Sequence, residues 1–194
     1  MSYFPAFIKL DNKKILIVGG GKIAGEKLQK LLDFTDDITL IASEFLAETM
    51  QLASKHSLQT LKKSYKEGDI DGFDIVIVTV DDIEVQKSIY KECQAKRILC
   101  NSVDSVAYCD FIFPSYTKKG DLTIAYSTSG ISPSFAKYLR RTMEQLIPDS
   151  VNDFLAQMQK LRKELPKGKE RMQLLDAKAK QYVESLFKKE KNVQ

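Results

Sequence analysis

The sequence predicts an α/β fold with a parallel sheet, followed by a strand-helix segment and a small C-terminal helical domain. Three observations predict it. Short apolar runs alternate with helix-like segments over roughly the first hundred residues, a glycine turn joins the first run to a helix, and residues 151–194 show helical periodicity. Strands that alternate with helices form right-handed βαβ units, so we expect a Rossmann-type parallel sheet.

The elements of this sheet are predicted in chain order. Residues 4–10 alternate enough to form an edge strand or a hairpin arm. Buried strands are expected at 15–18, 38–41, 75–80 and 97–100, with amphipathic helices at 26–34, 45–52 and 83–95.

Proline and glycine mark the elements that follow. We expect a short strand at 110–115, a hairpin turn at 118–121, and a helix that begins at Ser132-Pro133 and runs to Leu146. Pro148-Asp149-Ser150 should stop that helix and cap the next one. Pro166-Lys167-Gly168 should then separate two amphipathic helices.

Composition indicates a cytoplasmic globular protein. The 194 residues carry a net charge of +4, and no apolar run approaches the roughly 18 residues of a membrane helix. Residues 1–10 lack the basic and apolar regions of a signal peptide. Cys93, Cys100 and Cys109 form no C-x-x-C pair, so we expect neither a disulfide nor a metal site.

The C-terminal region is rich in lysine and arginine. We interpret residues 151–194 as two amphipathic helices with solvated basic faces, and we expect no nucleic-acid partner. A nucleic-acid surface and a groove for a polyanionic small molecule are the alternatives.

The glycine turn is a dinucleotide-binding fingerprint in its proper context, between a strand and a helix. Gly19 makes the tight turn, Gly21 lets the backbone approach a pyrophosphate, and Ala24 fills the third small position. The helix N-terminus favours phosphate, and Lys22 adds a cation. We therefore predict that a nucleotide cofactor binds Gly19, Gly20, Gly21, Lys22, Ile23 and Ala24.

A P-loop and a plain connecting turn are the alternatives to a dinucleotide site. A P-loop needs Lys-Ser/Thr after its last glycine, but Gly25 is followed by Glu26 and Lys27, which leaves no hydroxyl for magnesium. The glycines alone do not distinguish a dinucleotide site from a turn that only joins a strand to a helix.

The ends of two other strands complete the predicted cofactor site. An acidic residue is expected on the adenosine ribose about 20 positions after the glycines, and Ser43 and Glu44 stand there. No lysine or arginine is present to hold a 2′-phosphate, so we expect NAD instead of NADP. Thr79 and Asp81 are predicted at the cofactor edge, and Asp82 competes with them as a helix cap.

Three further strings are more specific than the glycine turn. They are Asn101-x-Val103-Asp104, Phe111-Ile-x-Pro-Ser115 and Ser127-x-Ser-Gly-x-Ser-Pro133. With the glycine turn they resemble the precorrin-2 dehydrogenase family, the N-terminal module of siroheme synthases. The resemblance implies NAD-dependent oxidation of precorrin-2 to sirohydrochlorin, a tetrapyrrole. Some members of the family are also sirohydrochlorin ferrochelatases, with ferrous iron as a substrate.

The resemblance also implies a homodimer of three-part subunits. Residues 1–113 would be the NAD-binding Rossmann domain, residues 114–147 a dimerisation segment exchanged between subunits, and residues 148–194 the helical domain. The positions of the proline and glycine residues are consistent with these boundaries.

Asp104 is the predicted catalytic base. It follows the carboxyl end of a predicted strand, where open α/β sheets bind their ligands, and the catalytic aspartate of the family aligns with it. A turn or cap at Asp104 is the structural alternative, and Asp81 and Asp82 are the competing acids. His56, the only histidine, is expected on the surface.

The substrate is a polycarboxylate, so cations and hydroxyls are predicted to bind it. The candidates are Ser127, Thr128 and Ser129 in the serine-rich loop, and Lys137 and Arg140 on the next helix. Arg140 and Arg141 are adjacent on that helix and cannot both face one site. The alternative function is a non-catalytic, nucleotide-sensing Rossmann module, which would bind cofactor without turnover.

Overall fold

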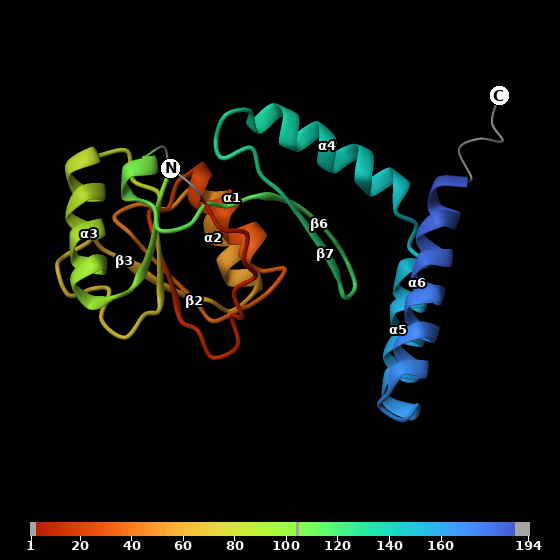
Figure 1. Cartoon of the computed structure of the whole chain (residues 1–194). Helices are drawn as coiled ribbons and strands as arrows, with labels where there is room; N and C mark the ends of the chain where they lie inside the picture. The colour runs from red at the N-terminus through yellow and green to blue at the C-terminus, as the bar shows by residue number, and fades with distance from the viewer. Residues whose placement is uncertain (1–2, 104, 189–194) are drawn as a thin grey trace. The chain divides into compact units, whose positions relative to one another are not determined.

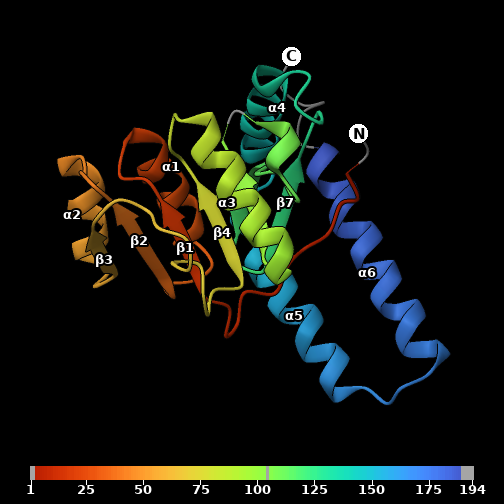
Figure 2. The same ribbon diagram turned by 90° about the vertical axis from the view of Figure 1, so that its left-hand side faces the viewer.

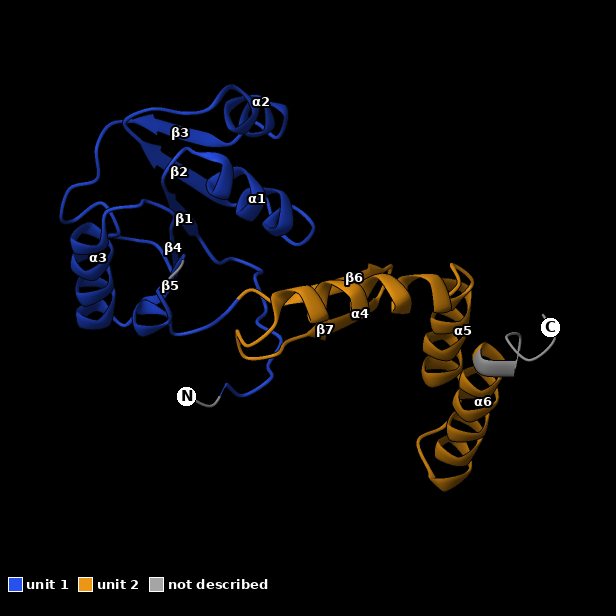
Figure 3. Cartoon of the chain, turned by 90° about the horizontal axis from the view of Figure 1, so that it is seen from above, with its two compact units in different colours: residues 1, 3–112 blue, residues 2, 113–194 orange. Residues whose placement is uncertain are grey.

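The structure is a computed structural model that describes residues 3–103 and 105–188. The chain forms two compact units, the first ending at Ile112 and the second beginning at Phe113 (Figure 3). Each unit has its own architecture. The first is an α/β layer structure, and the second combines a β-hairpin with three helices.

The first unit is built on a five-stranded parallel sheet (Figure 1), with its strands in the order β3-β2-β1-β4-β5 (Figure 3). Its strands are β1 (Ile15–Val18), β2 (Ile38–Ala42), β3 (Gln59–Lys62), β4 (Ile75–Val78) and β5 (Leu99–Ser102). The central strand β1 pairs with both β2 and β4, and all four of its residues are buried. The predicted parallel sheet is confirmed.

Helices cover both faces of this sheet (Figure 2). The helices α1 (Lys22–Leu31) and α2 (Ala47–Lys55) lie on one face and contact each other, and α3 (Ile83–Lys96) lies on the other. Ile89 and Cys93 of α3 are fully buried in a core cluster with strand residues such as Val76. Burial of apolar surface at about 25 cal/mol per Å² makes this core the main stabilising term of the unit.

Several predicted elements of the first unit were wrong in position or kind. Residues 4–10 form no strand and belong to neither described sheet, and Phe4 and Phe7 are exposed. An alternating pattern is not enough for a strand, because a strand is stable only when it pairs with others. The predicted strand at 110–115 does not form; β6 starts only at Ser115, after Pro114, which lacks an N–H donor.

Other differences concern element boundaries. The polar edge strand β3 was not predicted, since only Leu61 in it is strongly apolar. Helix α1 begins at Lys22, four residues before the predicted start, because Gly21 itself is the N-cap. Strand β5 lies two residues after its predicted start at Arg97, since Arg97 adopts a left-handed conformation that ends α3.

The second unit starts with the antiparallel hairpin of β6 (Ser115–Lys119) and β7 (Leu122–Tyr126). Gly120 makes the predicted turn with φ +54°, and the Lys119 ammonium bonds the Ile147 carbonyl oxygen at 2.6 Å. Helix α4 (Pro133–Leu146) packs on the hairpin, and its N-cap Ser132 accepts the Phe135 N–H as expected.

Helices α5 (Val151–Glu164) and α6 (Lys169–Lys188) complete the second unit as a hairpin. Phe154 and Tyr182 stack between them with ring centroids 4.1 Å apart. Ser150 stands at the N-cap of α5, but its side chain accepts no capping hydrogen bond and lies 3.3 Å from the Tyr182 hydroxyl instead. No described helix is both long and apolar enough to cross a membrane.

Candidate functional site

Two of the three glycines after β1 are required by the fold itself. Gly19 has φ +127°, and a Cβ there would collide with Thr79 Oγ1 at the end of β4. A Cβ at Gly20 would collide with the carbonyl oxygen of Glu44, after β2. The loop is therefore held between the ends of both strands that flank β1, and it leads directly into α1.

Gly21 is different, because nothing in the protein requires a glycine there. Its φ of −79° is open to any residue, and a Cβ would meet no heavy atom within 4 Å. It is the N-cap of α1, where no side chain caps the helix and no acidic residue stands in the first turn. The open space lies in front of the unpaired N–H groups and the positive end of a helix, which fits the pyrophosphate of a dinucleotide.

A small pocket lies at the carboxyl ends of the central strands, next to this loop. It brings the predicted cofactor residues Ile23, Thr79 and Asp81 together with Val103, which directly precedes Asp104. The rest of its wall is formed by Val80, Ile83 and Gln86. This is the rim where open α/β sheets bind ligands, and the pocket is lined from α1, from the segment after β4, from α3 and by the residue that follows β5.

The polar residues after β4 have separate tasks. The Thr79 hydroxyl donates to the Val18 carbonyl oxygen at 3.0 Å and so closes the glycine turn. Asp82 caps α3 by accepting the N–H groups of Glu84 and Val85. Asp81 stays exposed at the pocket. Asp82 is therefore the helix cap, and Asp81 is an exposed acid in the lining of the pocket.

Gln86 is a pocket residue that sequence reasoning missed. It is 5% exposed, and its amide nitrogen donates to the Val80 carbonyl oxygen at 2.7 Å. The only signal in the sequence was a polar residue on the inward face of α3, four positions after its cap Asp82. Its role is to fix the strand-to-helix turn that carries Asp81.

Ser43 and Glu44, the predicted ribose ligands, follow β2 directly and are both exposed. The Leu46 N–H donates to the Gly20 carbonyl oxygen at 2.9 Å, which ties this segment to the glycine loop. Residues 43–46 contain no lysine or arginine. The arrangement keeps a carboxylate beside the place where an adenosine ribose binds in this fold.

Asp104 itself lies outside the described residues, but its predecessor does not. The Val103 N–H donates to the Val78 carbonyl oxygen at 2.9 Å, which continues the β4–β5 ladder beyond Ser102. Val103 is also part of the pocket lining.

The predicted substrate residues all belong to the second unit. The Ser127 hydroxyl accepts the Ser129 N–H at 3.1 Å, and the Thr128 hydroxyl accepts the Ser132 N–H at 2.9 Å, so the serine loop is ordered by its own side chains. Lys137 is exposed on α4. Arg140 forms an ion pair with Glu144, and Arg141 lies 5.7 Å from the centre of the Tyr138 ring.

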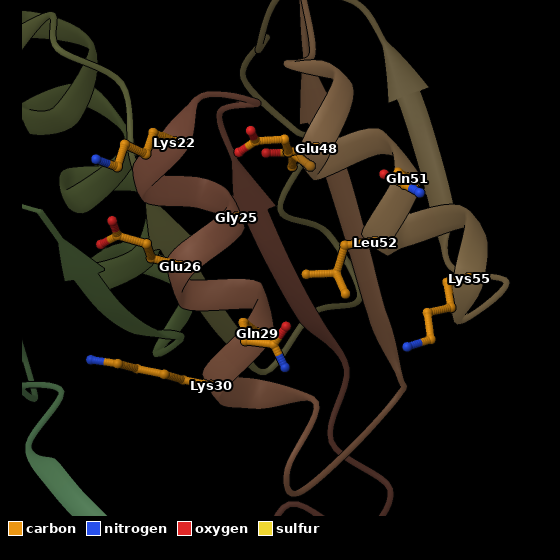
Figure 4. A pocket seen from close by; sticks show the side chains of 10 residues that line it. Lys22, Gly25, Glu26, Gln29, Lys30, Glu48, Gln51, Leu52 and Lys55 are labelled. Atoms are coloured by element: carbon orange, nitrogen blue, oxygen red, sulfur yellow. The ribbon is translucent and has the colours of Figure 1, made fainter.

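A larger groove lies between α1 and α2, the two helices that share one face of the sheet (Figure 4). Gln29 and Leu52 point toward one another across it, while Lys22 points to the other side of α1. The groove is lined by the carboxylates Glu26 and Glu48 as well as by lysines, so it offers no concentrated charge to an anion. It was not predicted, and it is separate from the pocket beside Val103.

Among the described residues, the remaining titratable groups form no cluster that could hold a metal ion. His56 is exposed at the end of α2, as predicted. All three cysteines are free thiols, and the described residues contain no cluster of three metal-binding side chains.

The fold and the glycine site define a dinucleotide-binding protein of the Rossmann class. Residues 6–115 match the family model described as "Putative NAD(P)-binding", and the chain belongs to that family. The predicted nucleotide cofactor is thereby confirmed as NAD(P).

Individual proteins of known name also match about three quarters of the chain. It is 36% identical over 151 residues to a siroheme synthase of Pseudoalteromonas translucida, covering 78% of this chain and 32% of that protein. A siroheme synthase of Methylococcus capsulatus is 36% identical over 148 residues, covering 76% of this chain and 31% of that protein. The chain thus spans about a third of the length of these relatives.

A solved structure confirms the fold. The structure described as SirC, precorrin-2 dehydrogenase, superposes with a TM-score of 0.76 at 22% identity, covering 96% of this chain and 100% of that one. The predicted Rossmann-type architecture with a helical C-terminal part is therefore shared with a known protein.

Proposed function

We propose that this chain is an NAD-dependent precorrin-2 dehydrogenase that forms sirohydrochlorin. The observation that carries the proposal is the pocket at the sheet rim, where Ile23 of the cofactor loop and Val103, next to Asp104, share one wall. Relatives named siroheme synthase and a structural neighbour named precorrin-2 dehydrogenase support the substrate class.

The reaction needs a binding site for the pyrophosphate of the cofactor, a hydride acceptor and a proton acceptor. The N-terminus of α1 and the open space at Gly21 bind the pyrophosphate. Bound NAD⁺ supplies a nicotinamide ring that accepts the hydride. Asp104 takes the proton that leaves as the conjugation of the macrocycle extends, so it is the general base.

The residues around the base orient both partners. The Val103 N–H donates to the Val78 carbonyl oxygen and fixes the backbone just before Asp104, and Thr79 and Asp81 line the same pocket as Val103. Ser43 and Glu44 bind the ribose hydroxyls, which favours NAD⁺ over NADP⁺ because the 2′-phosphate would meet a carboxylate. A cytoplasmic location is consistent with a dehydrogenase whose cysteines are free.

The test is an absorbance assay with purified protein and freshly generated precorrin-2. With NAD⁺ we expect the spectrum of sirohydrochlorin and one NADH per product. With NADP⁺ we expect a kcat/KM at least about tenfold lower, which corresponds to roughly 1.4 kcal/mol, because the 2′-phosphate would meet a carboxylate. Cofactor binding with no turnover would contradict the proposal and favour a nucleotide sensor.

The same carboxylate would accept pyrrole protons when iron enters sirohydrochlorin. Ferrous iron added to the completed reaction tests this second activity. Siroheme absorbance would establish it, whereas an unchanged sirohydrochlorin spectrum would restrict the chain to oxidation.

The substrate carboxylates are proposed to bind cations of the second unit. Lys137 is the stronger candidate, because its ammonium is exposed, while Arg140 must first leave Glu144. Ser127, Thr128 and Ser129 would present a loop already ordered by internal hydrogen bonds. The three-part division into residues 1–113, 114–147 and 148–194 belongs to the same proposal.

A homodimer joined through residues 114–147 is part of this function. Helix α4 exposes 61% of Phe135 and 63% of Tyr138, and Leu139 beside them is also exposed. An apolar helix face on a unit that is otherwise folded marks an interface. A second copy of the chain is the partner that the family resemblance implies.

The assembly is tested by light scattering at micromolar concentration. We expect twice the subunit mass of 22.0 kDa for the native chain, and the subunit mass after Phe135→Glu combined with Leu139→Glu, because two carboxylates would be buried in the interface. The control Gln157→Glu adds a charge to an exposed position of α5 and should remain dimeric. A monomeric native chain would contradict the proposal.

A further inference from the structure

The start of helix α2 holds two consecutive carbonyl groups of the glycine loop. The Leu46 N–H donates to the Gly20 carbonyl oxygen at 2.9 Å. The Thr49 hydroxyl donates to the Gly21 carbonyl oxygen at 3.2 Å. Leu46 is the N-cap of α2 and Thr49 lies in its first turn, so one end of this helix binds both peptide groups.

The side chain of Thr49 is buried between the two helices. The residue is 2% exposed, although threonine usually lies at the surface. The Gly21 carbonyl oxygen that it binds also accepts the Gly25 N–H at 3.1 Å, which is the first hydrogen bond of α1. Thr49 therefore adds a second hydrogen bond to the carbonyl of the residue that caps α1.

Gly25 leaves the space that the Thr49 hydroxyl occupies. A Cβ at Gly25 would lie 2.9 Å from Thr49 Oγ1, so the hydroxyl would have to move. Helices α1 and α2 contact each other here, with Gly25 between them (Figure 4). A glycine inside a helix lowers its stability relative to alanine, and the contact with Thr49 gives a physical reason for this one.

Peptide geometry relates these carbonyl contacts to the direction of two N–H groups. In a planar trans peptide the C=O and the N–H point in opposite directions. The Gly20 carbonyl shares its peptide with the Gly21 N–H, and the Gly21 carbonyl shares its peptide with the Lys22 N–H. Because α2 holds both carbonyls, both N–H groups point away from α2. They are two of the four N–H groups that the start of a helix leaves without an internal partner.

We propose that Thr49 is a positioning residue for the cofactor, holding the Gly21–Lys22 peptide so that its N–H donates to the pyrophosphate. This inference rests on the proposed pyrophosphate site at the N-terminus of α1. A donor that is already oriented reduces the ordering cost of binding. Thr49 acts through the Gly21 carbonyl and does not touch the cofactor, so its loss affects affinity and not the chemical step.

The test is calorimetric titration of Thr49→Val and Thr49→Ser in the full chain. The ligands are NAD⁺ and ADP-ribose, which keeps the pyrophosphate but has no nicotinamide. Valine keeps the shape of threonine but has no donor, so the dissociation constants of both ligands should rise about fivefold, the effect of one hydrogen bond. Serine keeps the hydroxyl and should restore most of the affinity. In Thr49→Val the KM for NAD⁺ should rise with the dissociation constant, while kcat stays near that of the native chain.

Gly25→Ala tests the same hydrogen bond without changing Thr49. The added Cβ displaces the hydroxyl, so the dissociation constant for NAD⁺ should rise by a similar factor. In a Thr49→Ala background the Oγ1 is absent, and Gly25→Ala should cause no further loss of affinity. The matched control is Thr39→Val, which removes the hydroxyl of another buried threonine, in β2, and should leave the dissociation constant unchanged.

The outcomes separate the role of Thr49 from the cofactor site itself. Native affinity in Thr49→Val, no rescue by serine, additive losses in the cycle with Gly25, or an equal loss in Thr39→Val would overturn the role of Thr49. If Gly21→Asp also kept native affinity for NAD⁺, the pyrophosphate site would be overturned as well. A loss in Gly21→Asp with native affinity in Thr49→Val would overturn the role of Thr49 alone.

Discussion

Gly21→Asp is expected to abolish NAD⁺ binding, with at least about a hundredfold loss of affinity, while the fold stays intact. The backbone of Gly21 already has φ −79°, and a Cβ meets no heavy atom within 4 Å, so the side chain fits the protein without strain. Aspartate is also a favourable N-cap, so the free energy of unfolding should stay the same or rise by a few tenths of a kcal/mol. The carboxylate would occupy and repel the position of the pyrophosphate.

Calorimetric titration of NAD⁺ together with thermal unfolding checks this result. Gly21→Asn is the matched control, because asparagine has the same size and capping ability without the charge, and it separates steric exclusion from repulsion. Gly20→Ala is expected to do the opposite, lowering stability through its collision with the Glu44 carbonyl oxygen. Unchanged NAD⁺ affinity in Gly21→Asp would remove the glycine loop from the cofactor site.

Asp104→Asn is expected to lower turnover of precorrin-2 by about 10²-fold or more. The amide keeps the size and most of the hydrogen-bonding shape of the carboxylate, but it cannot accept a proton at neutral pH. NAD⁺ affinity should stay near that of the native chain, because the pyrophosphate is assigned to α1 and not to this residue. Stopped-flow absorbance for turnover and titration for NAD⁺ provide the two measurements.

Asp81→Asn is the control for Asp104→Asn, because the two variants together show which of the two acids is the general base. Asp81 is an exposed acid that lines the pocket, and we expect its substitution to weaken NAD⁺ binding modestly with a smaller effect on kcat. A large loss of kcat in Asp81→Asn with full activity in Asp104→Asn would transfer the base to Asp81. A joint loss of stability and cofactor binding in Asp104→Asn would mark it as a structural cap.

Elements whose sequence signals lie within a few adjacent residues could be predicted from the sequence. Strand β1 was predicted with its observed bounds, because four consecutive apolar residues precede a glycine turn, and the start of α3 was predicted because its capping acid and helical spacing are local. The conformation of residues 4–10 and the existence of strand β3 could not be predicted in this way, because a strand at the edge of a sheet depends on a partner far along the chain.

The sequence by itself determined the class of the protein and the identity of its cofactor loop, since strand, glycine turn and helix are contiguous from Lys14 to Ala24. Only the tertiary structure decided what each glycine is for. Gly19 and Gly20 are required by contacts with Thr79 and Glu44, which other strands bring to the loop, whereas Gly21 faces open space. It also decided that Val103 lines one pocket together with Ile23 and Thr79. The physical reason is that propensity and capping act between neighbours in the chain, while collisions, pockets and shared hydrogen bonds exist only after the sheet has brought distant residues together.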